Sequence, residues 1–453
     1  MNVSKKVSRS EEIARRDDEL TSPSTRIKYF PLAVAKARGS KIWDADGNEY
    51  IDFLSGAAVA NVGHCHPKVV TAIKEQSDKF IHYTLAYMYY EPALNLTKKL
   101  VEITPGRFPK KVAYGLSGSD SNDGAIKLAR SFTGRQKMIS FLKSYHGTTY
   151  GALSLSGITL RMRRKVGPML PEIYHVPFPD CYRCIFKLEY PECGLHCLDY
   201  IEMLLDILIP PEETAGLVIE PIQGDAGVII PPGDYLTRLS KLCKDHGILF
   251  VAEEVQTGFG RTGKWFAVNH WNLKPDIILL AKAIAAGMPM SAIVSKKEIM
   301  DAWAGSQVHL FTGEANPISC AAAIANIDII AEEKLCERSA RLGEYAMKRF
   351  KEMMEKHELI GDVRGKGLMI GVDLVKDRKT KEPARKESLK VDWRSWEKGV
   401  VLIHFGKSVL RIAPPLVITE EELDRGISTI EEAIDDVEKG KVPDDVVRKM
   451  GGW

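Results

Sequence analysis

The sequence lacks the long apolar runs that mark membrane-spanning segments. No run approaches the roughly 20 residues that a membrane helix needs. The first 20 residues are highly charged and lack the apolar core of a secretory signal. The formal net charge is only +3, too small to indicate a nucleic-acid-binding surface. These absences predict a cytoplasmic protein that binds neither membranes nor nucleic acids.

Side-chain amides are also scarce. The 453 residues include only 5 glutamines and 9 asparagines, while 45% of the chain is hydrophobic and 27% is charged. Because amides are labile at high temperature, their depletion favours a thermophilic source. The length and the apolar fraction fit one large domain together with a smaller one.

Four of the eight cysteines form a cluster in the sequence. Cys181 and Cys184 have C-x2-C spacing, and Cys193 and Cys197 follow with C-x3-C spacing. Such a set can bind zinc tetrahedrally. It can equally form disulfides, which are unusual in cytosol outside hyperthermophiles, or remain as free thiols. No polar residues of a catalytic metal site surround the cluster, so we expect a structural staple without metal.

Short apolar runs alternate with amphipathic helical patterns from about residue 111 onward, which is typical of a mainly parallel sheet covered on both faces. Ligands of such sheets bind beyond the carboxyl ends of the strands. After residue 330 the pattern changes to long helices with a small sheet. We expect an α/β protein with an arm and part of the small domain at 1–67, a large domain at 68–330 and a small α+β domain at 331–453. The predicted strands of the large domain are 111–115, 138–142, 216–220, 248–252, 277–281 and 291–294.

Two motifs resemble ligand sites but lack the required context. Residues 258–263 match G-x-G-x-x-G, yet the sequence that follows does not begin a helix, as a dinucleotide site requires. His64 and His66 are too close in the chain to share one metal easily, and Pro67 indicates a turn. Neither motif is interpreted as a site.

Lys282 and Glu253 match two needs of pyridoxal 5′-phosphate, which requires a lysine for a Schiff base and an acid beside its pyridine nitrogen. Lys282 ends an apolar run, so it is expected at the carboxyl edge of the sheet. Glu253 ends another run, where a buried carboxylate needs a partner such as a pyridinium. Taken alone, each residue would more often be solvated or ion-paired.

A phosphate cup and a wall for the ring are also present. Residues 115–122 are small and polar and lead into a helix, so their backbone N–H groups can bind phosphate, although the same string is a good ordinary helix cap. Tyr145 follows a strand and can stack on the ring. Gln256 can donate a hydrogen bond to the phenolic oxygen of the cofactor.

With these residues together, the chain resembles the class III aminotransferases, which are pyridoxal-phosphate enzymes of fold type I. The resemblance runs from Asp44 to Thr419, and its most specific part is Glu220-Pro-Ile-Gln-Gly, Glu253-Glu-Val-Gln-Thr-Gly and Lys282. It implies a mainly parallel seven-stranded sheet and a homodimer with a shared active site, which can pair further into tetramers. The cofactor contacts that it implies are Ser117, Gly118, Ser119, Tyr145, His146, Glu253, Val255, Gln256, Lys282 and Thr312 of the partner subunit.

Two departures from the family pattern bear on the reaction. Glu253 stands where the family usually has aspartate, which keeps the charge and adds one methylene. Thr148 stands where relatives acting on 4-aminobutyrate or ornithine carry an arginine that binds a substrate carboxylate. The second departure argues against a transaminase of ω-amino acids.

The family resemblance also extends to amino-acid racemases such as isoleucine 2-epimerase, which are thought to use an aspartate shortly after the motif glutamate. Asp225 occupies that place after Glu220, although it is nearly as well explained as a loop cap. Tyr87 lies in the largely apolar segment 83–90, which borders the substrate pocket in the family and equally suits core packing. We predict a racemase of nonpolar α-amino acids, such as leucine or methionine, with Lys282 and Asp225 as its two bases.

The alternative is an aminotransferase that moves an amino group to 2-oxoglutarate or another keto acid. In the family, the residue at Arg411 binds a carboxylate or pairs with the residue at Glu220, and both are present here. An inactive cofactor-binding scaffold is disfavoured by the intact Lys282. The roughly 40 residues before the family match are too few for an added DNA-binding domain.

Overall fold

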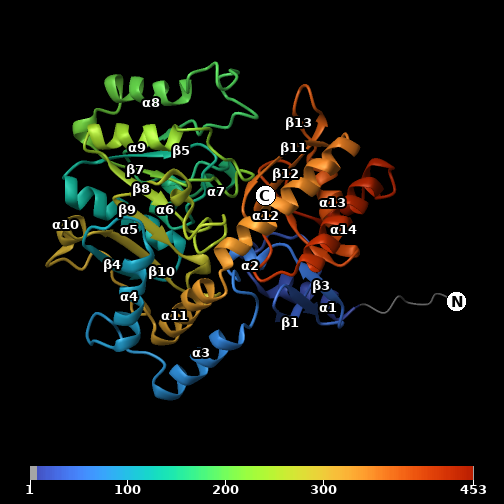
Figure 1. Ribbon diagram of the computed structural model, residues 1–453, viewed down its shortest axis with the longest axis horizontal. Coiled ribbons are helices and arrows are strands. Elements are labelled where there is room, and N and C mark those ends of the chain that lie inside the picture. Colours follow the sequence, from blue (N-terminus) through green and yellow to red (C-terminus); the bar gives the residue numbers. More distant parts are fainter. Residues whose placement is uncertain (1–7, 452–453) are drawn as a thin grey trace. The chain divides into compact units, whose positions relative to one another are not determined.

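The computed structural model describes residues 8–451. They divide into two compact units (Figure 1): a large unit, Pro67–Ala340, and a small unit made of the described parts of the segments before and after it, Met1–His66 and Arg341–Trp453. No helix within the described part of the chain is long and apolar enough to cross a membrane.

The large unit is built on a seven-stranded sheet with the order β4-β10-β9-β8-β7-β5-β6. Strand β10 is antiparallel to both of its neighbours, whereas β9, β8, β7, β5 and β6 run parallel. The predicted α/β class with a mainly parallel seven-stranded sheet is therefore confirmed. The strands are β4 (Lys110–Gly115), β5 (Lys137–Phe141), β6 (Ile173–Val176), β7 (Thr214–Ile219), β8 (Leu249–Glu253), β9 (Ile277–Leu280) and β10 (Ser291–Lys296).

Strand β6 is the one member of this sheet that the apolar runs did not predict. It lies at the sheet edge, and only its last residue, Val176, is fully buried. A half-exposed edge strand needs no continuous apolar run, so its sequence carries little signal. The G-x-G-x-x-G string at residues 258–263 forms turns, and no α-helix begins there.

The helices of the large unit include α5, which packs across β7, β9 and β10, and α11, which packs against α3 and α4. Helix α5 begins with a capping box between Ser117 and Asp120 and ends at Gly134 in the left-handed conformation, as is common for helix ends. The helices are α3 (Pro67–Lys79), α4 (Glu91–Ile103), α5 (Gly118–Thr133), α6 (Tyr150–Leu155), α7 (Leu160–Arg163), α8 (His196–Ile207), α9 (Tyr235–Asp245), α10 (Lys297–Met300), α11 (Pro317–Glu332) and α12 (Leu335–Lys356), which contains the boundary between the units.

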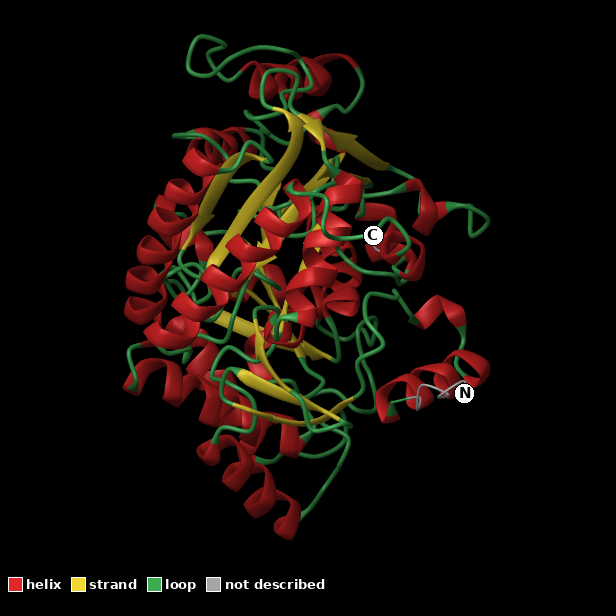
Figure 2. Cartoon of the chain, turned by 90° about the vertical axis from the view of Figure 1, so that its right-hand side faces the viewer, coloured by secondary structure: helices red, strands yellow, loops and turns green. Residues whose placement is uncertain are grey.

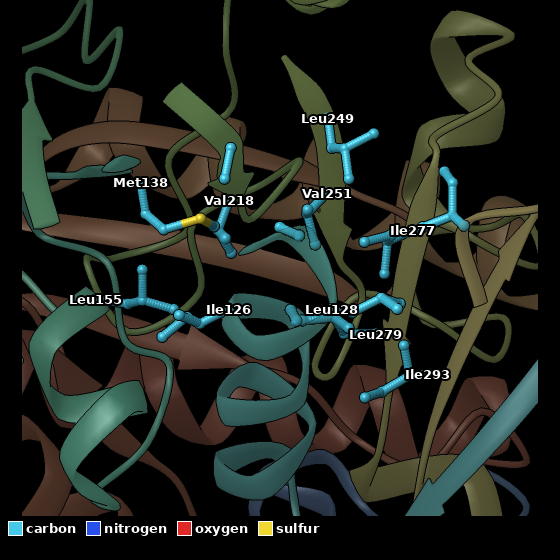
Figure 3. Close-up of a cluster of buried hydrophobic side chains, with 14 of the residues drawn as sticks. Ile126, Leu128, Met138, Leu155, Val218, Leu249, Val251, Ile277, Leu279 and Ile293 are labelled. Atoms are coloured by element: carbon cyan, nitrogen blue, oxygen red, sulfur yellow. The ribbon is translucent and has the colours of Figure 1, made fainter. Parts of the chain in front are cut away.

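The core of the large unit lies between α5 and the sheet. Ile126 and Leu128 of α5 face buried side chains of the strands, among them Val251, Leu279 and Ile293 (Figure 3). Each such side chain contributes about 1.5–3 kcal/mol by leaving water. A dense core of this kind holds the strand ends rigidly, and the residues that follow those ends are positioned with them.

The small unit contains two small sheets, with the orders β1-β2-β3-β14 and β11-β12-β16-β15. Figure 2 shows strands and helices of the chain by type. The strands are β1 (Val34–Arg38), β2 (Lys41–Asp44), β3 (Glu49–Asp52), β11 (Ile360–Lys366), β12 (Met369–Asp377), β13 (Glu382–Pro383), β14 (Val400–Val401), β15 (Ile403–Phe405) and β16 (Val409–Ile412). The helices are α1 (Arg9–Leu20), α2 (Ser55–Ala58), α13 (Arg385–Glu397), α14 (Glu420–Glu438) and α15 (Val446–Lys449).

Candidate active site

A pocket of 180 Å³ in the large unit gathers most of the residues singled out from the sequence. Its lining residues follow the carboxyl ends of parallel strands, the edge at which α/β sheets bind ligands. The lining residues are Gly118, Ser119, Tyr145, His146, Gly147, Glu220, Asp225, Glu253, Val255, Gln256 and Lys282.

Lys282 comes directly after β9, at the start of a short 3₁₀ turn, and is half-buried. Its φ of 46° is uncommon for a residue other than glycine. Asn326 of α11 donates hydrogen bonds through Nδ2 to the carbonyls of Ala283 and Ile284, at 2.8 and 3.3 Å. Because strained backbone persists only where its surroundings hold it, this anchor fixes the position from which the lysine projects.

Glu253 is the last residue of β8 and is buried. One carboxylate oxygen accepts a hydrogen bond from the backbone N–H of Val255 at 2.7 Å, and the other lies 3.2 Å from Nδ1 of His146. The Nε2 atom of His146 is buried and has no hydrogen-bond partner among the described residues. The site therefore presents a buried, oriented carboxylate that is suited to a cationic ligand group.

Glu220 follows β7 and is also buried. Its two oxygens accept hydrogen bonds from the backbone N–H groups of Tyr145 (3.0 Å) and Gly224 (2.9 Å). Burial, followed by the nearby Glu253 carboxylate, raises the pKa of Glu220 well above its ordinary value. Glu220 thus ties together the loops that carry Tyr145 and Asp225.

The cup predicted for phosphate lies at the N-terminus of α5. Gly118 and Ser119 line the pocket, whereas Ser117 caps the helix by accepting a hydrogen bond from the N–H of Asp120. A Cβ on Gly118 would lie 2.9 Å from Cγ1 of Val255, and one on Gly147 would lie 2.1 Å from Oγ of Ser119. The loops approach this helix end closely because the two glycines carry no side chain.

Asp225 is buried and accepts a hydrogen bond from Nε2 of Gln256, with Nε2 3.2 Å from Oδ1. A Cβ on the neighbouring Gly224 would collide with the Gln256 amide at 2.4 Å, so the two loops are in tight contact. Burial, followed by the carboxylates of Asp225 and Glu253, raises the pKa of Tyr145. The Tyr145 phenol consequently stays protonated at neutral pH.

Four further residues predicted from the sequence do not line this pocket in the described chain. Thr148 donates its backbone N–H to Oγ of Ser119 at 3.2 Å and is otherwise exposed. Tyr87 is 75% exposed, and Thr312 is exposed as well. Arg411 belongs to β16 of the small unit, where its guanidinium carbon lies 3.4 Å from the ring centroid of Phe405.

Two residues of the site were not assigned a role from the sequence. Gly147 lines the pocket and has a φ of 129°. Its place in the Ser-Tyr-His-Gly string was the only sequence feature that pointed to a role in the site. Glu254, next to Glu253, accepts hydrogen bonds from the backbone N–H groups of Ala267 and Val268 and from the Thr257 hydroxyl. It therefore holds the long turn that follows β8.

The residues of the pocket fit pyridoxal 5′-phosphate. They supply an amine on a rigid turn, a buried acid, an aromatic ring and a helix N-terminus without obstructing side chains, which are the elements that this cofactor requires. His146, Glu220 and Glu253 offer ligand atoms within 4.8 Å of one another. Lys282 and the N-terminus of α5 line the same pocket as these three residues. We therefore interpret His146, Glu220 and Glu253 as part of the cofactor site.

A model described as aminotransferase class-III matches residues 23–434. The chain belongs to this family. Among the relatives of this class-III member, the leucine/methionine racemase of Thermococcus litoralis is 49% identical, over 98% of this chain and 100% of its own length. The isoleucine 2-epimerase of Lentilactobacillus buchneri is 44% identical, over 96% of this chain and 97% of its own length.

Solved structures of the family agree with the fold. An amine transaminase from an uncultivated Pseudomonas species, in its pyridoxal-phosphate-bound form, has a TM-score of 0.85 and 30% identity, over 92% of this chain and 96% of that one. Members of the class-III family bind pyridoxal 5′-phosphate, which confirms the predicted cofactor. The chain is thus a pyridoxal-phosphate-dependent enzyme of this family.

Proposed function

We propose that this class-III member is a racemase that interconverts the L- and D-forms of nonpolar α-amino acids. The observation that carries the proposal is the presence of two candidate acid/base groups, Lys282 and Asp225, in one pocket. They follow β9 and β7, the strands on either side of β8, which carries Glu253 at its end. A reaction that removes a proton from one side of Cα and returns one to the other requires two such groups.

The cofactor, when bound, withdraws electrons from the substrate and makes its Cα–H bond acidic. Glu253 would hold the ring nitrogen protonated, Tyr145 would contact the ring, and Gly118 and Ser119 would bind the phosphate. The Cα–H bond breaks as its proton moves to Lys282 or Asp225, and a new Cα–H bond forms with a proton from the other group.

Gln256 supports the role of Asp225. Its amide donates a hydrogen bond to the Asp225 carboxylate and so orients it in the pocket. A loop-capping role alone would not require the side chain to reach a ligand pocket, whereas Asp225 lines the pocket.

Two observations support the substrate class. The relatives named above act, by their names, on leucine, methionine or isoleucine. Thr148 supplies no second cationic group for the distal carboxylate of an ω-amino acid. We propose that Arg411 binds the α-carboxylate. We also propose that, in a homodimer, the segment around Tyr87 and Thr312 of the partner subunit together complete the site.

Homodimerisation is supported by the exposed surface of this segment. Large apolar side chains rarely gather on a monomer surface without a binding role. Five such side chains are exposed within nine residues: Ile81, Tyr83, Tyr87, Met88 and Tyr89. Light scattering on the purified holoenzyme should give the mass of a dimer or of a multiple of it, and a monomer mass would contradict this part of the proposal.

The activity test is incubation of the holoenzyme with L-leucine or L-methionine in the absence of any keto acid. Chiral chromatography should detect the D-form approaching equal amounts of both enantiomers. Lys282→Ala serves as the inactive control. If no D-form arises, but 2-oxoglutarate starts turnover, the chain is an aminotransferase and the racemase proposal is wrong.

An aminotransferase is the second candidate, because the chain retains both Glu220 and Arg411 and is similar to an amine transaminase. In the large unit, both oxygens of Glu220 already accept backbone hydrogen bonds. This arrangement suits a loop-holding role better than an ion pair that opens and closes, and it favours the racemase.

A further inference from the structure

The four clustered cysteines lie around one small cavity, outside the cofactor pocket. The cavity is lined by Cys181, Cys184, Cys193 and Cys197 together with mostly apolar side chains, and all four cysteines are free thiols. They belong to the loop between β6 and α8 and to the first turn of α8. Figure 1 shows α8 at the edge of the large unit, beyond α9.

Local structure presents the cysteines as two pairs. Cys184 begins a tight turn, since its carbonyl accepts a hydrogen bond from the N–H of Lys187 at 3.1 Å. Cys193 precedes α8 and accepts at its carbonyl from the N–H of His196 at 3.0 Å, and Cys197 is the second residue of that helix. Gly194 and Leu195, which both have positive φ, turn the chain between Cys193 and the start of α8.

The cavity has a volume of 20 Å³, which suits a single ion or water and is too small for an organic ligand. Its apolar lining includes Phe178, Leu188 and Leu195.

The loop itself needs a cross-link. Residues 178–195 contain no α-helix or strand, and a structureless stretch of this length is uncommon in a compact domain. Of its large apolar side chains, Phe178 and Leu195 at its two ends are buried, whereas Ile185, Leu188 and Tyr190 between them are exposed. A ligand that joins both cysteine pairs would fasten the loop to α8.

We propose that Cys181, Cys184, Cys193 and Cys197 bind one structural zinc ion as a tetrahedral set of four thiolates. Four S–H bonds break and four Zn–S bonds form, and the protons pass to solvent. Among the described residues, His146, Glu220 and Glu253 are the only group of three or more possible ligands whose ligand atoms all lie within 4.8 Å of one another. The four sulfurs must therefore move inward to bind the ion. Arg183, stacked on Tyr182, and Arg238, which donates to the Gly194 carbonyl, add positive charge to the same loop.

Zinc also explains the pattern better than one disulfide within each pair does. A disulfide within either pair closes a loop of only a few residues and constrains the chain little. One tetrahedral ion engages both pairs at once, as C-x2-C motifs do in structural zinc sites. His196 lines the cavity too, but its ring packs edge-on against Phe186 with centroids 4.9 Å apart, so we assign it no ligand role.

The test is the zinc content of holoenzyme purified under reducing conditions from zinc-supplemented cells. We expect about one zinc ion per chain, retained in the control variants Cys65→Ser and His196→Ala. Cys184→Ser and Cys197→Ser should each retain at least tenfold less. Cobalt added to metal-free protein should produce visible ligand-field bands at longer wavelength than the cofactor band, and these should be absent in Cys184→Ser.

Thermal unfolding provides a second measurement. A strong chelator should lower the unfolding midpoint of the wild type and of Cys65→Ser, but it should not lower that of Cys197→Ser further. Zinc-free protein with all eight thiols titratable after denaturation would overturn the proposal. Disulfides in protein purified without reductant would appear as a mass deficit of two hydrogens per bridge. Such a deficit, together with the absence of metal from both preparations, would also overturn the proposal.

Discussion

Replacing Asp225 with asparagine should separate proton removal from proton return. Asparagine has nearly the same shape and keeps an oxygen that can accept the hydrogen bond from Gln256, which spans 3.2 Å in the wild type. The position is buried, so water cannot easily take the place of the lost carboxylate. The substitution therefore removes the acid/base function and leaves the packing of the pocket in place.

The expected magnitude follows from the role of the group. General acid or base catalysis contributes about 10²–10⁴-fold, so racemisation by Asp225→Asn should fall by that factor, equivalent to about 3–5 kcal/mol of activation free energy. Lys282 is unchanged, and it should still exchange the α-proton of one enantiomer with solvent. Asp225→Asn should then label one enantiomer in deuterium oxide without inverting it.

The assay follows L- and D-leucine separately in deuterium oxide. Proton NMR reports loss of the α-proton signal, and chiral chromatography reports inversion. Asp234→Asn is the matched control, since Asp234 is exposed and outside the pocket. A visible spectrum confirms that each variant still holds the cofactor.

One result would refute the reasoning directly. If Asp225→Asn interconverts the enantiomers within a few-fold of the wild-type rate, Asp225 is not the second base. If it loses inversion and exchange together while it keeps a normal cofactor spectrum, Asp225 acts before proton removal, for example in substrate binding.

Three further perturbations test the cofactor site and its support. Glu253→Gln should weaken cofactor binding roughly tenfold to a hundredfold through loss of a charged hydrogen-bond partner, while Glu253→Asp should restore it; equal retention of cofactor in both variants would contradict the role of the charge. Gly147→Ala, whose Cβ would meet Ser119 at 2.1 Å, should cost about 1–3 kcal/mol of unfolding free energy and release cofactor, unlike Gly134→Ala, which has positive φ but open space. Burial raises the pKa of Glu254 from 4.5 to about 7, so the folded state binds more protons than the unfolded state and loses roughly 3 kcal/mol of stability as pH rises through that interval. Glu254→Gln should flatten this dependence in denaturation curves between pH 5 and 8, and an unchanged slope would remove Glu254 as its source.

The sheet was largely readable from the sequence, because buried parallel strands must be continuous apolar runs. The strands ending at Glu253 and before Lys282 have such runs and appear where they were expected. The edge strand β6 was missed because half-exposed residues give no such pattern. Element order also placed the chemistry at one edge, since parallel strands present their carboxyl ends together.

Contacts between segments distant in sequence could not be read in advance. The hydrogen bond from Gln256 to Asp225, the approach of His146 to Glu253 and the anchoring of the Lys282 turn by Asn326 all depend on loop conformation. The spacing of residues along the chain does not predict such contacts. Local conformation also explains why Ser117 caps a helix, whereas its neighbours Gly118 and Ser119 line the pocket.

Residue identity and apolar periodicity are local properties, so the family, the cofactor and the residues that end the strands could be predicted from the sequence. Which polar groups face one pocket, and which form helix caps and loop contacts, depends on the tertiary structure. It also gathered four cysteines, read first as a staple without metal, around a cavity of ionic size. Packing decides these matters because a side chain's chemistry depends on what surrounds it, and its surroundings come from distant parts of the chain.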